Sequence, residues 1–154
     1  MFARIVVTTL FTVLVGYSSA QVQVILPARS IRARESIEAR VLNPSNGPVT
    51  YCVQMGQYSP KGDTIESTPF PFYIQKRGGD QWNTLMIGPD IGSLLTVVVL
   101  DPGKAHEFPF RIADTGTIRL VLEYWLGDRK NMSCPGPTKG KKTARSKVLL
   151  ISPG

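Results

Sequence analysis

Alternation of apolar and polar residues with a period of two is the feature that most constrains how this chain can fold. The pattern is clearest over residues 117–126. There, one set of alternate positions holds Ile118, Leu120, Leu122, Tyr124 and Leu126, and the other holds Arg119, Val121, Glu123 and Trp125. Successive side chains of a β-strand point to opposite faces of the sheet, so this segment is expected to bury one face. Since no segment keeps a helical period of 3.6 for three turns, the pattern predicts an all-β fold.

Turn-forming residues separate further segments of the same kind. Residues 35–42 and 49–55 alternate in the same way, and residues 94–100 form a continuous apolar run. Gly78 and Gly79 supply the positive φ that a tight hairpin turn requires. Seven or eight such strands, with the most apolar ones in the interior, predict an immunoglobulin-like antiparallel β-sandwich. An open barrel is the alternative architecture.

The first twenty residues have the composition of a signal peptide. A short positive start with Arg4 is followed by an uncharged stretch of about 12 residues and then by the small residues Ser18 and Ala20. The stretch is shorter than the roughly 20 residues that span a bilayer, so we expect cleavage before Gln21 and no membrane span afterwards. An uncleaved anchor is the alternative. Residues 21–154 would then form one domain with a single core.

The mature chain keeps two cysteines, Cys52 and Cys134. Paired thiols persist as disulfides in the oxidising compartments that exported proteins reach, so we expect these two to be bonded. Such a bond would close a loop of 82 residues and stabilise the fold by roughly 4 kcal/mol in the chain-entropy model. Two free buried thiols are the alternative. A metal site is not expected, because two distant cysteines and His106 offer too few ligands.

Positive charge dominates the chain, whose formal net charge is +7 and would be +6 without Arg4. The densest group follows residue 127. It comprises Arg129, Lys130, Lys139, Lys141, Lys142 and Arg145. These residues are candidates for contact with an anionic partner, either an unknown protein or an anionic polymer of the cell envelope. A solvated loop kept soluble by its charge is the alternative. Nucleic acid is not expected as a partner, because an exported protein seldom meets it.

No catalytic machinery is apparent in the residue pattern. The sole histidine, His106, has no evident nucleophile and orienting carboxylate beside it. The acidic residues lie mainly in turns, where Asp commonly bonds its own backbone. The glycines are scattered or paired at turns, and none opens a helix as a phosphate-binding loop requires. We therefore expect neither an enzyme nor a bound cofactor.

Trp125 and Val121 fall on the face opposite the predicted core stripe. They could form an exposed aromatic patch with Tyr51 or Tyr73, since aromatic residues often anchor interfaces. Alternatively, loops could cover this face, as happens over central strands of a sandwich.

The stretch 97–125 resembles the bacterial immunoglobulin-like domains. The similarity lies in a strand leading into Leu100-Asp101-Pro102-Gly103-Lys104, then a strand of alternating Phe, then Asp114-Thr115-Gly116-Thr117-Ile118-Arg119-Leu120. It extends diffusely over residues 35–151 and implies the same sandwich fold. Antibody-type domains carry Tyr where Ile118 stands and Cys where Leu120 stands, so their inter-sheet disulfide does not transfer to this chain.

These observations favour an exported, non-catalytic binding or structural module of the cell envelope or extracellular space. The alternative is a proteinase inhibitor, because the chain also resembles, more loosely, the immunoglobulin-like proteinase inhibitors of bacteria. In that case a protruding loop such as residues 59–68 would enter the protease.

Overall fold

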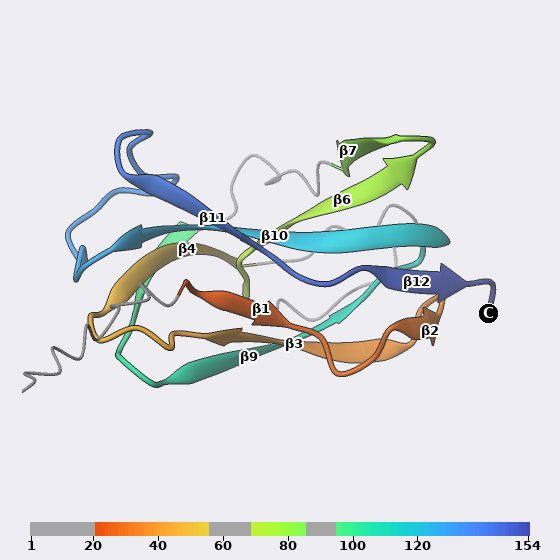
Figure 1. The fold of residues 1–154 in the computed structure, drawn as a ribbon, viewed down its shortest axis with the longest axis horizontal. Coiled ribbons are helices and arrows are strands. Elements are labelled where there is room, and N and C mark those ends of the chain that lie inside the picture. The colour runs from red at the N-terminus through yellow and green to blue at the C-terminus, as the bar shows by residue number, and fades with distance from the viewer. Residues whose placement is uncertain (1–20, 56–68, 86–94) are drawn as a thin grey trace, which may run out of the picture.

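The computed structural model describes residues 21–55, 69–85 and 95–154. These residues form a β-sandwich of two sheets packed face to face, as the alternation predicts (Figure 1). The small sheet contains β1 (Gln23–Ile25), β3 (Ser36–Leu42) and β9 (Ala105–Arg111), in the order β1-β3-β9 with antiparallel pairing. Within the described ranges, no helix is long and apolar enough to cross a membrane. The predicted signal peptide, residues 1–20, lies outside them.

The large sheet is organised around β10 (Gly116–Leu126). The other strands of the large sheet are β2 (Ser30–Arg32), β4 (Val49–Met55), β5 (Pro69–Phe70), β6 (Phe72–Gly78), β7 (Gln81–Leu85), β8 (Leu95–Leu100), β11 (Lys141–Arg145) and β12 (Leu149–Ser152). One edge of β10 pairs with β4 and β6, and the other edge pairs with β11 and β12. β10 is thus the strand through which most of the large sheet is connected.

The described residues contain twelve strands rather than the seven or eight expected. Pro71 separates β5 from β6, because proline has no N–H for the ladder. Ser146 separates β11 from β12: its backbone N–H donates to the carbonyl oxygen of Leu120, and its Oγ accepts from the Leu120 N–H, both at 2.9 Å. The side-chain oxygen takes the place of a backbone carbonyl, so the strand bends there without leaving Leu120 unsatisfied.

The core lies between the two sheets and consists of the predicted inward-facing stripes. It includes Ile37, Ala39, Val41, Tyr51, Phe72, Phe108, Phe110, Ile118, Leu120, Leu122 and Tyr124, all of them buried. Burial of each large side chain stabilises the fold by about 1.5–3 kcal/mol. Aromatic rings meet edge to face across the sandwich, with the Phe72 and Phe108 centroids 5.7 Å apart.

β8 departs from the expectation that the most apolar strands are interior. It lies at the edge of the large sheet and pairs with β4 within the described part of the chain. Leu100 at its end is 1% exposed, whereas Leu95 is 37% exposed. A continuous apolar run is typical of a strand covered on both faces. Of its inward residues, Leu100 is buried, Val98 is half-buried and Thr96 is exposed, so β8 is covered fully only at its end.

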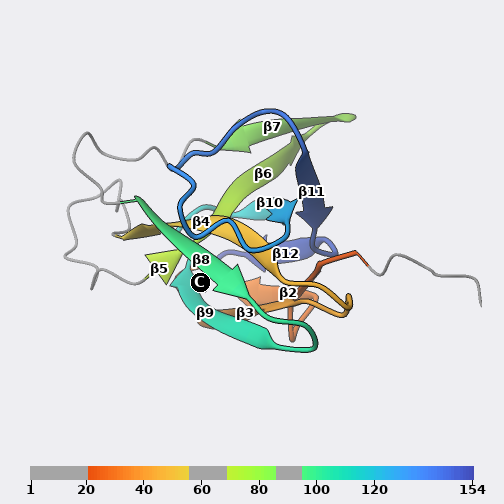
Figure 2. The same cartoon turned by 90° about the vertical axis from the view of Figure 1, so that its left-hand side faces the viewer.

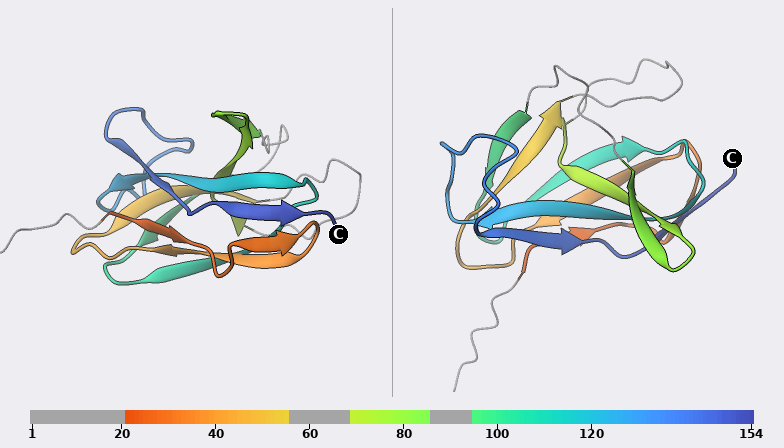
Figure 3. Two further views of the ribbon diagram at one scale, coloured as in Figure 1. Left: turned by 45° about the vertical axis from the view of Figure 1, so that its right-hand side comes forward. Right: turned by 90° about the horizontal axis from the view of Figure 1, so that it is seen from above.

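The N-terminal part of the domain contributes to both sheets. β1 pairs with β3 in the small sheet, and β2 then pairs with the last strand, β12, in the large sheet. The β2–β12 pairing is parallel, and Figure 3 shows these two strands side by side near the C-terminus.

Candidate functional site

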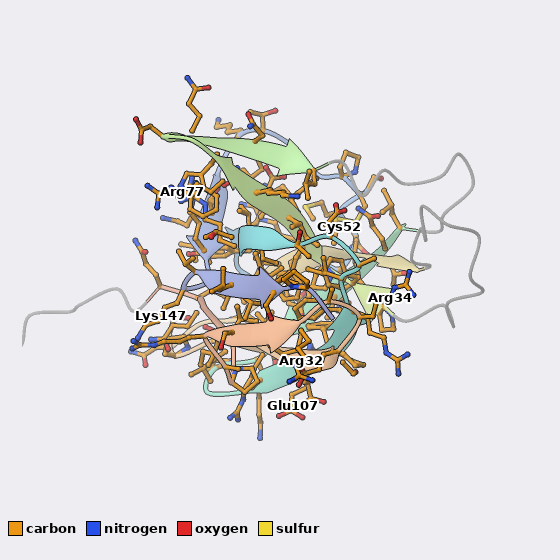
Figure 4. All side chains as sticks on the ribbon, turned by 90° about the vertical axis from the view of Figure 1, so that its right-hand side faces the viewer. Arg32, Arg34, Cys52, Arg77, Glu107 and Lys147 are labelled. Atoms are coloured by element: carbon orange, nitrogen blue, oxygen red, sulfur yellow. A yellow bond between two sulfur atoms is a disulfide. The ribbon has the colours of Figure 1, made fainter. Side chains whose placement is uncertain are left out.

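A disulfide between Cys52 and Cys134 confirms the predicted pairing. Cys52 lies in β4, with its Cα 5.8 Å from that of Cys134 in the segment 127–140, which we call the long loop. Figure 4 shows Cys52 within the body of the domain. Since Cys52 alternates with the core residues Tyr51 and Val53, its sulfur lies on the outer face of the large sheet. The bond therefore fixes the long loop against that outer face.

Trp125 is buried beneath the long loop and is 1% exposed. Its indole Nε1 donates to the carbonyl oxygen of Pro137 at 2.9 Å. Thr50 holds the start of the loop, because its Oγ1 donates to the Gly127 carbonyl at 2.7 Å and accepts from the Arg129 N–H at 2.9 Å. The sequence allowed either an exposed aromatic patch or a face covered by loops, and at Trp125 the face is covered. Tyr73 remains 39% exposed.

The six basic residues predicted to meet an anionic partner do not all lie on one face. Alternation along β11 places Lys141 and Arg145 on the outer face of the large sheet and Lys142 on the other. Lys141 forms an ion pair with Glu123 at 2.8 Å, and the hydrogen bond to that carboxylate raises the pKa of Lys141.

The three remaining members of the group belong to the long loop. Lys130 and Lys139 are exposed, while Arg129 is half-buried and donates from Nε to the Leu126 carbonyl at 3.2 Å. Other cations are spread around the domain: in Figure 4, Arg77 and Lys147 project on one side and Arg34 on the opposite side.

The outer face of the large sheet also carries Arg119, a cation for which the sequence pattern predicts no role. Its guanidinium lies 4.2 Å from the ring centroid of Trp82 in β7, and its Nε donates to Gln75 Oε1 in β6 at 2.7 Å. The β6–β7 hairpin rises from the sheet on one side of this face and the long loop rises on the other (Figure 1). Alternation assigned Arg119 to the outer face, but only the pairing of β10, β6 and β7 brings Trp82 beside it.

Arg119 and Arg145 lie close enough to influence one another. Burial and the Arg145 guanidinium both lower the pKa of Arg119. In the described segments, the single ion pair is that of Lys141 with Glu123, so neither arginine has a carboxylate partner there. Tyr73 completes the group, and its pKa is raised by partial burial and then by Glu123. We call Tyr73, Gln75, Trp82, Arg119 and Arg145 the outer-face cluster.

A separate groove of about 520 Å³ opens between the edge strands of the two sheets. It is lined by residues of β3, β4, β5, β8 and β9, including Val53, Val98, His106 and Phe108. The Tyr51 hydroxyl lies 2.6 Å from Nδ1 of His106, so this histidine is hydrogen-bonded to the core. Burial raises the pKa of Tyr51. No group of three metal-binding side chains occurs within residues 21–55, 69–85 and 95–154. The predicted inhibitory loop, residues 59–68, lies outside those ranges.

No family model matches the chain, and no curated protein matches it. Its structure is similar to that of Spo0M, a sporulation control protein from Bacillus subtilis, with 12% identity and a TM-score of 0.38 over 87% of this chain and 49% of Spo0M. It is also similar to the seventh ASH/PapD-like domain of human CEP192, with 12% identity and a TM-score of 0.33 over 99% of both chains. The chain spans about half the length of Spo0M.

Proposed function

We propose that the chain is an exported, non-catalytic immunoglobulin-like module that binds an anionic partner of the cell envelope or extracellular space. The contact is made by the outer-face cluster. The observation that carries the proposal is the pair Arg119 and Arg145 on the outer face of the large sheet. Arg145 pairs with Val121, two residues along β10 from Arg119, and neither arginine has a carboxylate partner in the described residues. Their mutual repulsion would be relieved by an anionic group bound between them.

The chemistry of the cluster suits carboxylate, sulfate or phosphate groups. A guanidinium presents a planar fork of donors that matches such groups, and charge-assisted hydrogen bonds are about twice as strong as neutral ones. Arg119 is already oriented by Trp82 and Gln75, so less side-chain freedom is lost when it binds. The exposed ring of Tyr73 adds apolar area of the kind that anchors interfaces.

Two features support export. Residues 1–20 have the charge and apolar pattern of a signal peptide. The Cys52–Cys134 bond belongs to an oxidising compartment, because cytosolic thiols are kept reduced.

The test measures binding of the protein to two soluble polyanions, polyglutamate and dextran sulfate, with uncharged dextran as the blank. At about 0.15 M salt, where exposed charges beyond about 8 Å are screened, R119Q/R145Q is expected to weaken binding at least about tenfold. K130Q/K139Q, which removes the same charge from the long loop, is the matched control and should weaken binding only slightly.

Equal losses in the two double variants would mean that net charge alone attracts the polymer, and the outer-face cluster would then not be the site. Undiminished binding by R119Q/R145Q would have the same meaning. Thermal unfolding of each variant checks that the fold is intact.

A further inference from the structure

The groove between the sheets has an apolar interior. Alternation along β8 points Thr96 and Val98 inward, and Val53 of β4 and Phe108 of β9 line the same space. Figure 2 shows β8 and β9, the edge strands of the two sheets, facing the viewer with β4 and β5 behind them. A volume of about 520 Å³ is within the range of small-molecule sites.

His106 lines this groove and is hydrogen-bonded to Tyr51. Tyr51 is fully buried, and within the described residues its hydroxyl has one hydrogen-bond partner, Nδ1 of His106. If Nδ1 carried the proton, the buried Tyr51 hydroxyl would be left without an acceptor, which costs about 1–3 kcal/mol. We therefore assign Nδ1 as the acceptor, which leaves Nε2, on the side of the ring away from Tyr51, as the N–H donor.

The rim of the groove carries charge. Arg40 and Glu107 are cross-strand neighbours on the outer face of the small sheet, and both are among the residues that line the groove. No ion pair joins them, since the Lys141–Glu123 pair is the one found among the described residues. With the excess of positive charge on the chain, Arg40 and the Nε2–H of His106 favour an anionic head group at the rim.

We propose that this groove binds a medium-chain aliphatic carboxylic acid. The alkyl chain lies between the sheets against Val53, Val98 and Phe108, and the carboxylate accepts from Nε2–H of His106 and from Arg40. This site is separate from the outer-face cluster and does not depend on the function proposed for that cluster.

The first experiment is calorimetric titration of the oxidised protein with decanoate. Saturable binding with one equivalent is expected. V98W and T96W fill the groove from β8 and are expected to abolish the binding, whereas V97W, on the outward face of the same strand, is the matched control that keeps it. T96W replaces an exposed residue, so it provides a groove-filling variant even if V98W fails to fold.

The second experiment tests the head group. R40Q and H106F should each weaken decanoate binding about tenfold, as expected for loss of a hydrogen bond to a charged group. R111Q, which removes an arginine from the same outer face of the small sheet, is the matched control. E107Q should tighten binding, because it removes a negative charge from the rim beside the bound carboxylate, and decanol should bind more weakly than decanoate.

The proposal is overturned if decanoate fails to bind the wild-type protein, or if V97W loses binding as fully as T96W. Equal affinity for decanol and decanoate, unchanged by R40Q and H106F, would rule out the anionic head group. R119Q/R145Q should leave decanoate binding intact, so failure of one proposal is distinguishable from failure of the other.

Discussion

The side-chain amide of Asn43 donates a hydrogen bond to the carbonyl oxygen of Leu100, 3.0 Å away and 57 residues further along the chain. Asn43 is fully buried, and its Nδ2 also donates to the Gly47 carbonyl while its Oδ1 accepts from the Ser45 N–H. Its backbone carbonyl accepts from the Gly103 N–H at 2.7 Å. One side chain thus joins the turn after β3 to the turn after β8.

Removal of the Asn43 amide is expected to destabilise the domain strongly. N43A leaves the Leu100 carbonyl without the buried donor of Asn43, whereas Ser45 Oγ still donates to the Gly47 carbonyl, and it should lower the free energy of unfolding by about 2–3 kcal/mol. N46A alters an exposed residue of the same turn and should change it by less than about 0.5 kcal/mol. Urea unfolding of both variants measures the difference, and similar midpoints would contradict the role assigned to Asn43.

Gly136 is expected to be intolerant of any side chain. Its φ is +83°, and a Cβ there would lie 2.5 Å from Cη2 of Trp125. Gly140 in the same loop has φ +76°, but its nearest neighbour would be Arg129 Nη2 at 3.5 Å. G140A should therefore cost about 1–2 kcal/mol from backbone strain alone, and G136A about 1–3 kcal/mol more from the clash. Thermal unfolding compares them, and equal losses would argue that the ring of Trp125 can move aside.

Loss of the disulfide should affect stability and the long loop together. C52S/C134S removes a cross-link between residues 82 apart and should lower the free energy of unfolding by about 4 kcal/mol in the chain-entropy model. Limited proteolysis should then cut within residues 127–140 earlier than in the oxidised protein. If reduction leaves both the unfolding midpoint and the cleavage pattern unchanged, the bond does not fix the loop.

Alkaline pH should destabilise the domain partly through Tyr51. Burial raises the pKa of Tyr51 in the folded state, so the unfolded chain releases this proton first, near its ordinary value of about 10. The contribution of Tyr51 is complete below that pH and is lost progressively above it, because deprotonation favours the unfolded chain. Y51F should show a shallower decline of unfolding free energy between about pH 9 and pH 12. Its penalty at neutral pH is about 1 kcal/mol, from the lost bond to His106.

Strand alternation accounts for most of what the sequence predicts correctly. The predicted faces of residues 35–42, 49–53 and 117–125 are buried, because the core between the sheets accepts one face of each strand. Leu126, which alternation also predicts to face inward, is 51% exposed at the end of β10. β2 was not predicted, since it has one inward apolar residue, Ile31, and exists through its pairing with β12, far away in sequence. Alternation does not predict β11 either, because its sequence, Lys-Lys-Thr-Ala-Arg, is mostly polar, although Ala144 is buried.

The candidate site was predictable only in its parts. The disulfide followed from the cysteine count and from the expected compartment, and the outward position of Arg119 followed from alternation. The stacking of Arg119 on Trp82 depends on the pairing of β10, β6 and β7, and the covering of Trp125 depends on how the long loop folds back. Neither leaves a periodic signal in the sequence.

The parallel pairing of β2 with β12 gives the domain a direction of mechanical strength. If the chain is pulled from residues before β2 and after β12, the two strands are drawn past one another along their length. All the hydrogen bonds of the pair then carry the load together, as in shear, whereas an antiparallel pair pulled from one end opens one bond at a time. Single-molecule stretching between the ends of the domain is therefore expected to meet its main resistance at this pair. I31P, which removes a backbone donor from β2, should lower the unfolding force.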